Sequence, residues 1–188
     1  MQEVISSPVF IPFKVSGFCR MQGTGTFHVE IDRERPKRKT RGGEEKLDAC
    51  YVRWAGPADA ASLAVLNTAF NGPGVSEQEI AERLTVSHTE RVALGFWNDL
   101  PSGFACAQCL HSICYTEPQG ELTELFVIEQ ARGQGLAMKL ISFLEQALRE
   151  EGVKSLRVTT GNANLPARKL YEKVGYKTKD YLTLSKRL

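Results

Sequence analysis

The most constraining feature of this sequence is a strand-like segment, a glycine turn and an amphipathic helix in direct succession over residues 121–150. Residues 121–128 have the apolar and β-branched content of a strand. After the turn at residues 132–135, apolar residues recur at helical spacing on one face, namely Leu136, Leu140, Ile141, Leu144 and Leu148. Gly152 then stands where a left-handed cap is expected to end the helix. A strand and a helix joined by so short a turn bury their apolar faces together, which requires a sheet covered by helices.

The rest of the chain from residue 50 fits such a sheet. Further strands are expected at residues 51–54, 91–97, 103–115 and 155–160, and residues 176–188 are expected to supply one or two more. Helices are expected at residues 57–70, after Ser76 with its capping partner Glu79, and at residues 164–173. This order predicts a mixed α/β fold whose central, mostly antiparallel twisted sheet has about six to seven strands flanked by helices.

Composition changes near residue 50. Residues 33–46 are charged and glycine-bearing, and Pro36 is their only apolar residue, so this stretch cannot bury enough surface to offset its ordering entropy. We predict an N-terminal extension over residues 1–49, partly flexible with a basic linker, and one domain over residues 50–188. The basic run lacks interleaved aromatic residues for base stacking, so we interpret it as a solvated linker.

Charge and hydropathy narrow the class of protein. A formal net charge of +2 gives no reason to expect a nucleic-acid partner. No apolar run reaches the roughly 18 residues that span a bilayer. Glu3 stands where a secretory signal carries positive charge, so we expect a cytoplasmic protein without a membrane partner. The five cysteines are an odd count in a chain of this size, and free thiols are expected.

The glycine turn at residues 132–135 is an anion-binding device. The start of a helix exposes unpaired N–H groups, and glycine lets the backbone approach an anion closely. A P-loop would need Lys and then Ser or Thr after Gly135, where Leu136 and Ala137 stand. A dinucleotide fingerprint would need a third glycine where Met138 stands. A tight connection without a ligand is the remaining alternative from the turn alone.

Two motifs together resemble a known family. The pattern Arg132-x-x-Gly135-x-Ala137 resembles the Arg/Gln-x-x-Gly-x-Gly/Ala signature of the GNAT superfamily of N-acetyltransferases. Residues 164–176 are similar to its Asn-x-x-Ala-x-x-Leu-Tyr-Glu-Lys-x-Gly-Phe segment, and residues 125–129 resemble the strand that leads into its loop. The resemblance implies the acyl-CoA N-acyltransferase fold for residues 50–188. Residues 1–49 have no counterpart.

The resemblance implies acetyl-CoA as cosubstrate and no metal. The backbone amides of the loop would hold the pyrophosphate, and Arg132 would add a charged donor. Main-chain groups of Phe126 and Val127 would accept the pantetheine arm as an added strand. Asn164 would contact the cofactor, cap its helix, or do both. The implied cofactor-binding residues are Phe126, Val127, Arg132, Gly133, Gln134, Gly135, Leu136, Ala137 and Asn164.

Two residues are candidates for proton transfer. Tyr171 matches the family tyrosine near the thioester sulfur and would donate a proton to the departing thiolate, and the alternative is a core tyrosine. Glu124 is the candidate base, acting through water, with Glu121 as the alternative. Glu124 could instead be a solvated carboxylate or hold a cationic substrate. Strand alternation places the two glutamates on opposite faces unless a bulge intervenes.

The resemblance thus implies an acetyl-CoA-dependent N-acetyltransferase. We expect direct transfer, in a ternary complex, to a primary amine of a small molecule such as an aminoglycoside or polyamine. The alternatives are a protein or peptide amine as acceptor, or a non-catalytic acyl-CoA-binding regulatory module. A homodimer is a further expectation. Cys106, Cys109, His111 and Cys114 are clustered in sequence, but on a strand they alternate between faces, and we predict no metal site.

Overall fold

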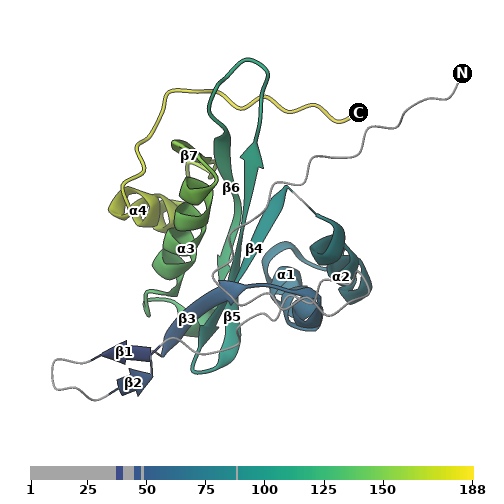
Figure 1. The fold of residues 1–188 in the computed structure, drawn as a ribbon, viewed down its shortest axis with the longest axis vertical. Coiled ribbons are helices and arrows are strands. Elements are labelled where there is room, and N and C mark those ends of the chain that lie inside the picture. The colour runs from purple at the N-terminus through teal and green to yellow at the C-terminus, as the bar shows by residue number, and fades with distance from the viewer. Residues whose placement is uncertain (1–36, 40–44, 48, 88) are drawn as a thin grey trace, which may run out of the picture. The chain divides into compact units, whose positions relative to one another are not determined.

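The computed structural model of the chain describes residues 37–39, 45–47, 49–87 and 89–188. Its main sheet has five strands in the order β3-β4-β5-β6-β7, with helices on both faces (Figure 1). All neighbouring strands are antiparallel except β6 and β7, which are parallel. The strands are β3 (Cys50–Trp54), β4 (Glu90–Trp97), β5 (Leu100–Leu110), β6 (Gln119–Val127) and β7 (Ser155–Val158).

Four α-helices are described. α1 and α2 lie over one face of the sheet, and α3 and α4 lie over the other (Figure 1). Short 3-10 turns precede α1 and α3. None of the helices in the described part of the chain is long and apolar enough to cross a bilayer. The helices are α1 (Ala60–Asn71), α2 (Glu77–Val86), α3 (Leu136–Glu150) and α4 (Leu165–Lys173), and the turns are η1 (Pro57–Asp59) and η2 (Glu129–Ala131).

The predicted fold class is confirmed, but the sheet has fewer strands than predicted. The expected strands at residues 176–188 are wrong, because this segment has no regular secondary structure. Tyr176 packs on the core, but the later apolar side chains are exposed, with Tyr181 and Leu182 at 85% and 92%. These two residues are adjacent, so a strand would turn them to opposite faces and could not bury both on one core. The strand expected to reach residue 115 ends at Leu110.

Part of the N-terminal extension has regular structure that the sequence pattern did not predict. β1 (Lys37–Lys39) and β2 (Glu45–Leu47) pair antiparallel in a separate two-stranded sheet. The rest of the predicted extension, apart from residue 49, lies outside the described residues.

The α3 helix packs closely on the sheet because its apolar face is continuous. Leu136, Leu140, Ile141 and Leu144 are each no more than 1% exposed. Opposite them the strands carry small residues. A Cβ atom built on Gly95 of β4 would lie 3.0 Å from the Cδ1 atom of Leu136, so α3 is seated against bare backbone there. The predicted glycine stop is confirmed at Gly152, whose φ is +89°.

The other face of the sheet has a separate core under α1 and α2. Leu63 and Leu66 of α1 pack on Leu94, Phe96 and Phe104 of the sheet. The predicted capping box starts α2, since the Ser76 hydroxyl accepts from the Glu79 N–H and the Glu79 carboxylate accepts from the Ser76 N–H. Two independent cores thus hold helices on opposite faces of one sheet.

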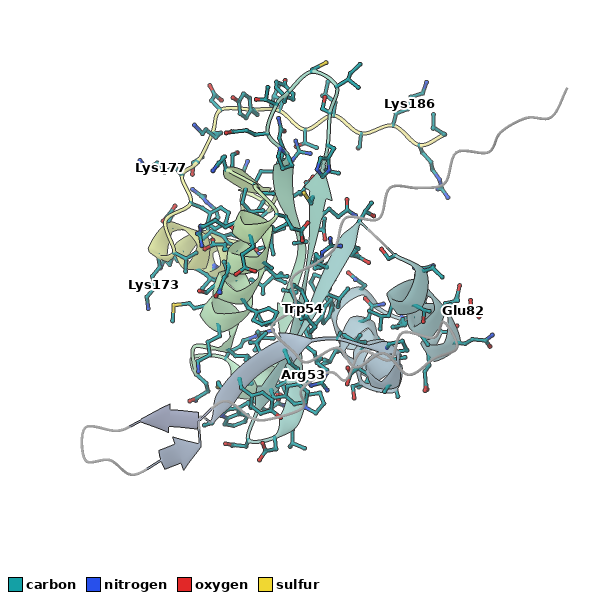
Figure 2. The ribbon with its side chains drawn as sticks, viewed as in Figure 1. Arg53, Trp54, Glu82, Lys173, Lys177 and Lys186 are labelled. Atoms are coloured by element: carbon teal, nitrogen blue, oxygen red, sulfur yellow. The ribbon has the colours of Figure 1, made fainter. Side chains whose placement is uncertain are left out.

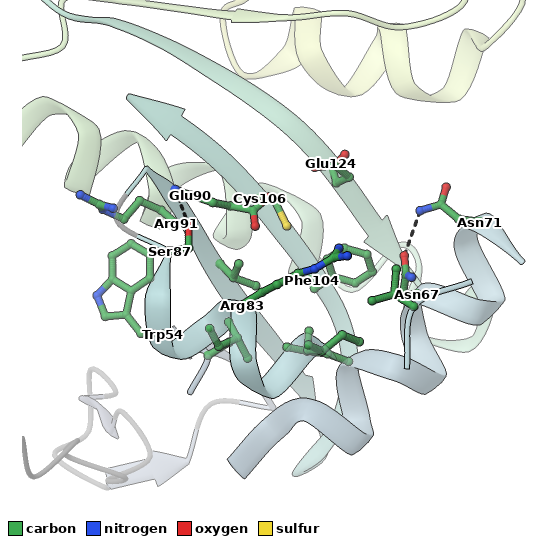
Figure 3. A pocket seen from close by; sticks show the side chains of 16 residues that line it. Trp54, Asn67, Asn71, Arg83, Ser87, Glu90, Arg91, Phe104, Cys106 and Glu124 are labelled. Atoms are coloured by element: carbon green, nitrogen blue, oxygen red, sulfur yellow. Dashed lines mark hydrogen bonds between the residues drawn. The ribbon is translucent and has the colours of Figure 1, made fainter. Parts of the chain in front are cut away.

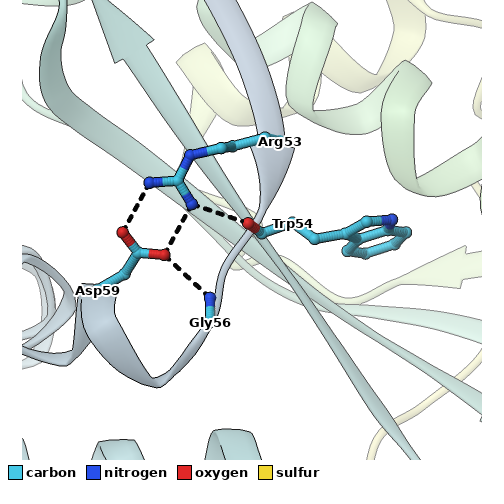
Figure 4. Close-up of polar contacts among 4 residues, drawn as sticks. All are labelled: Arg53, Trp54, Gly56 and Asp59. Atoms are coloured by element: carbon cyan, nitrogen blue, oxygen red, sulfur yellow. Dashed lines mark hydrogen bonds and ion pairs between the residues drawn. The ribbon is translucent and has the colours of Figure 1, made fainter. Parts of the chain in front are cut away.

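A bidentate ion pair fixes the entry into α1 (Figure 4). The Arg53 guanidinium donates two hydrogen bonds of 2.7 Å to the Asp59 carboxylate, and one Asp59 oxygen also accepts from the Gly56 N–H at 2.9 Å. Arg53 also donates to the carbonyl of Trp54 and lies 4.9 Å from the ring centroid of Phe96. The end of β3 and the first turn before α1 are therefore tied together.

Two leucine truncations test this account of the core. Leu144 of α3 is completely buried, whereas Leu182 is exposed in the terminal segment. We expect Leu144→Ala to lower the free energy of unfolding by about 2–5 kcal/mol, because it leaves a cavity under α3. The matched control Leu182→Ala should stay within about 0.5 kcal/mol of the wild type. Urea denaturation followed by circular dichroism measures both, and equal losses would contradict the assigned packing. Figure 2 shows the side chains between the sheet and its helices.

Candidate functional site

The glycine turn forms an open helix N-terminus. β6 ends at Val127, η2 follows, and Gly133 and Gly135 have φ angles of +77° and +84°. Gly135 is the N-cap of α3, and no side chain caps the helix. The N–H groups of the first turn therefore lack an intrahelical acceptor and carry the positive end of the helix dipole. This geometry can bind an anion such as a pyrophosphate.

Side-chain hydrogen bonds to two strands, β3 and β6, hold this turn in place. Nε of Arg132 donates to the Val127 carbonyl at 3.1 Å. The ammonium of Lys139 donates to the Cys50 carbonyl at 2.7 Å, and the Cys50 thiol donates to the Gln134 carbonyl with 3.6 Å between the heavy atoms. Arg132 thus fastens the turn to β6, and its contact with a phosphate stays a prediction. Sequence reasoning missed Cys50 and Lys139, which lie on other elements.

Among the described strands, none pairs with one edge of the second half of β6. β6 pairs with β7 only over residues 119–122, while β5 pairs with it as far as Val127. Phe126 and Val127 lie in the part that β7 does not cover. Main-chain groups on such an edge can accept an extended ligand as an added strand, which is the arrangement predicted for the pantetheine arm.

A β-bulge in β6 changes which side chains share a face. Ala107 of β5 is opposite Leu122, but Cys106 is opposite Glu124, so β6 has one extra residue at Thr123. Glu121 lies opposite Gln108, two residues from Cys106 on β5, so Glu121 and Glu124 end on the same face. The bulge that the sequence analysis left open is present. Glu121 is nevertheless bound to Arg157 at 2.7 Å and does not pair with Glu124.

Glu124 lines a cavity of about 410 Å³ between α1, α2 and the sheet (Figure 3). Its apolar wall includes Trp54, Leu63 and Phe104, and the amides of Asn67 and Asn71 stand on α1. The charged residues of the lining are Arg83, Glu90, Arg91 and Glu124. An acceptor with both an apolar part and a cationic group fits this lining.

Three side chains from neighbouring strands converge in this cavity. Ligand atoms of Glu90, Cys106 and Glu124 all lie within 4.8 Å of one another. Burial raises the pKa of the half-buried Glu90 carboxyl, the charge of Glu124 raises it further, and Arg83 partly offsets this effect. Burial, with the two carboxylates, also raises the pKa of the Cys106 thiol well above its usual value. The prediction of no metal site concerned other cysteine pairings and stays a prediction.

Sequence reasoning missed Glu90. The residue stands at the very start of β4, two residues before Val92, which is opposite Cys106. Alternation along the strand predicts that Glu90 and Val92 share a face, but only the order of β4, β5 and β6 brings that face beside Glu124.

Tyr171 and Asn164 lie on or beside α4, away from this cavity. Tyr171 is buried in the core under α3, its ring lies 5.5 Å from that of Tyr176, and burial raises the pKa of its phenol. It lines a different cavity, between β7, α3 and α4. The Asn164 side chain accepts a hydrogen bond from the Ala167 N–H at 3.3 Å, so its predicted capping role is present. Cofactor contact by either residue stays a prediction.

Comparisons with known proteins identify the family. A model of the acetyltransferase (GNAT) family matches residues 65–176. An uncharacterized N-acetyltransferase of Chlorobaculum tepidum is 27% identical over 130 residues, which cover 69% of this chain and 76% of that protein.

Solved structures show the same fold. The ribosomal-protein-alanine N-acetyltransferase of Brucella melitensis biovar Abortus 2308 superposes with a TM-score of 0.65 at 19% identity, covering 74% of this chain and 99% of that chain. An aminoglycoside N-acetyltransferase in complex with CoA gives a TM-score of 0.65 at 17% identity, covering 73% and 94%. The chain therefore belongs to the acetyltransferase (GNAT) family, whose members use acetyl-CoA, and it is an N-acetyltransferase.

Proposed function

We propose that this enzyme transfers the acetyl group of acetyl-CoA to a primary amine of a small molecule, of the aminoglycoside or polyamine type, by direct transfer in a ternary complex. The observation that carries the proposal is that β6 links the cavity at Glu124 to the N-terminus of α3. The bulged middle of β6 presents Glu124 to a partly open cavity with a second carboxylate, and the end of β6 leads into the open helix N-terminus. A site for the cationic amine at Glu124 and a site for the anionic pyrophosphate before α3 would thus lie along one strand.

The donor half rests on the turn before α3. The N–H groups of residues 133–137 would bind the pyrophosphate of CoA, helped by the dipole of α3. The uncovered edge at Phe126 and Val127 would bind the pantetheine arm by main-chain hydrogen bonds. This arrangement directs the thioester along β6 towards the bulge.

The acceptor half needs a proton acceptor, because a primary amine is an ammonium ion at neutral pH. Glu124 would take one proton, directly or through water. The amine nitrogen then attacks the thioester carbonyl, backbone N–H groups stabilise the oxyanion, and the carbon–sulfur bond breaks. Tyr171 would protonate the departing thiolate, since a phenol is protonated at neutral pH and burial raises the pKa of this one further.

The direct test is a panel of amines. With acetyl-CoA as donor, we expect CoA release with at least one polyamine or aminoglycoside, and mass spectrometry should find one added acetyl group on the amine. A peptide amine serves as the competing acceptor class. Measurable acetyl-CoA binding without release of CoA to any amine would contradict the proposal and favour the non-catalytic alternative.

A glycine substitution tests the donor site. Gly135→Ala places a Cβ atom beside the first turn of α3 in a left-handed backbone conformation, so we expect the Kd for acetyl-CoA to rise by roughly tenfold or more. Gly152→Ala is the matched control, since Gly152 has a similar φ angle of +89° after the other end of the same helix. Isothermal titration calorimetry measures both affinities. Equal affinities in the two variants would remove Gly135 from the donor site.

A tyrosine pair tests the proposed acid. We expect Tyr171→Phe to lower kcat by about 100-fold with little change in the KM for acetyl-CoA, because the thiolate loses its proton donor. Tyr176→Phe is the control, because its ring lies beside that of Tyr171 and its hydroxyl is buried without a hydrogen-bond partner among the described residues. Steady-state kinetics compare the two variants. Wild-type kcat in Tyr171→Phe would identify Tyr171 as a core residue only.

A further inference from the structure

The proposed mechanism does not use Glu90, although this residue faces the same cavity as Glu124. The three strands β4, β5 and β6 bring Glu90, Cys106 and Glu124 side by side (Figure 3). A role for these three side chains in acceptor binding rests on the proposed function, because it assigns the part of the active site that holds the amine.

Two carboxylates at this separation repel each other unless a cation or a proton lies between them. The cavity lining supplies two cationic side chains, but both have other partners. The guanidinium of Arg83 is 3.9 Å from Glu79 and largely exposed, and Arg91 binds Glu151 at 2.9 Å. Within the described part of the chain, neither Glu90 nor Glu124 makes a side-chain hydrogen bond or an ion pair with them. Among the described residues, no cation is in ion-pair contact with either carboxylate, and Arg83 acts on Glu90 only through its charge.

The thiol of Cys106 is an independent sign of an absent ligand. The side chain is only 7% exposed, lines the same cavity, and makes no hydrogen bond among the described residues. Burial of a polar group without a partner is unfavourable, and here the unpartnered thiol lies beside two unpartnered carboxylates. A hydrogen-bond donor that carries positive charge would satisfy all three groups.

We propose that Glu90 and Glu124 together bind the ammonium group of the acceptor and that Glu90 accepts its proton. The N–H bond of the ammonium breaks, its electron pair stays on nitrogen, and the proton moves to a carboxylate oxygen of Glu90. Glu124 holds the amine in place. When the tetrahedral adduct collapses, the second nitrogen proton goes to the thiolate through the proposed acid, and Glu90 releases its proton to water.

In this arrangement Glu90 replaces Glu124 as the proton acceptor of the proposed mechanism, and Glu124 holds the ammonium group. Glu90 is half-buried, and its raised pKa makes it a stronger base near neutral pH. The charged and titratable groups around it are Arg83 from α2, Cys106 from β5 and Glu124 from β6. The apolar wall at Trp54 and Phe104 then receives the carbon skeleton, so the acceptor class is an alkyl or sugar ammonium rather than a neutral or anionic molecule.

The test compares Glu90→Gln, Glu124→Gln and the double variant with the control Glu82→Gln. Glu82 stands on the exposed side of α2, where its carboxylate accepts a hydrogen bond from Gln78 at 3.0 Å (Figure 2). Spermidine and kanamycin are the probes. We expect Glu90→Gln to lower kcat/KM for the acceptor by about 100-fold, with an unchanged KM for acetyl-CoA. The wild-type kcat/KM should rise with pH as the Glu90 carboxyl loses its proton. This rise, the acid limb of the pH profile, should vanish in Glu90→Gln.

Two further measurements separate the possible failures. Glu90→Asp, which keeps a carboxylate, should retain the acid limb at reduced kcat, and circular dichroism checks that each variant is folded. Calorimetric titration of each probe into the complex of the enzyme with CoA measures amine binding, because CoA carries no acetyl group to transfer. The double variant should lose this binding.

If wild-type enzyme acetylates a probe while Glu90→Gln matches Glu82→Gln in rate and pH profile, the inference is wrong and the proposed function stands. If no probe is acetylated although acetyl-CoA binds, the proposed function is wrong. If the double variant still binds the probes as the wild type does, Glu90 and Glu124 are not the ammonium site and the inference is wrong. Loss of transfer with EDTA, restored by a divalent cation, would assign the cluster to a metal and overturn the proposal.

Discussion

The packing of α3 on the sheet is the interaction on which the rest of this structure depends. Its leucine face is completely buried, and at Gly95 the helix lies directly against the backbone of β4. Close packing leaves the helix little freedom to slide or tilt. Its N-terminus is therefore fixed just beyond the end of β6, where Arg132, Lys139 and Cys50 hold the preceding turn. An anion site built from backbone N–H groups needs such rigidity, because its donors have no side chains that could adjust.

The bulge at Thr123 makes this packing compatible with a polar cavity on the other face. Before the bulge, Leu122 points into the core under α3, and after it Leu125 and Val127 do so. The extra residue lets Glu124 turn towards α1 and α2 without removing an apolar side chain from the core. One inserted residue thus serves both faces of the strand. The chemistry proposed for Glu124 and the stability of α3 therefore depend on the same few residues.

Much of the fold could be predicted from local patterns. The periodicity of residues 136–148 predicted α3, the Ser76 capping box predicted α2, and the Gly152 stop was correct because each depends on neighbours within a few residues. The prediction of terminal strands was wrong, since Tyr181 and Leu182 favour a strand locally but lie exposed, with no apolar surface of the core to pack on. Glu90 was missed because its role depends on the lateral order of three strands, which no single segment encodes. Cys50 was missed for the same reason, since its partner Gln134 is 84 residues away.

The separate core on each face of the sheet has an evolutionary consequence. The helices that line the proposed acceptor cavity, α1 and α2, are held by their own small cluster around Leu63, Leu66 and Phe104. The turn that would hold the donor is supported from the opposite face by α3. Substitutions at sites that share no contacts have nearly additive effects. The lining of α1 and α2 can therefore drift towards a new amine while the grip on the cosubstrate stays intact, so a lineage can change what it acetylates without losing the ability to acetylate.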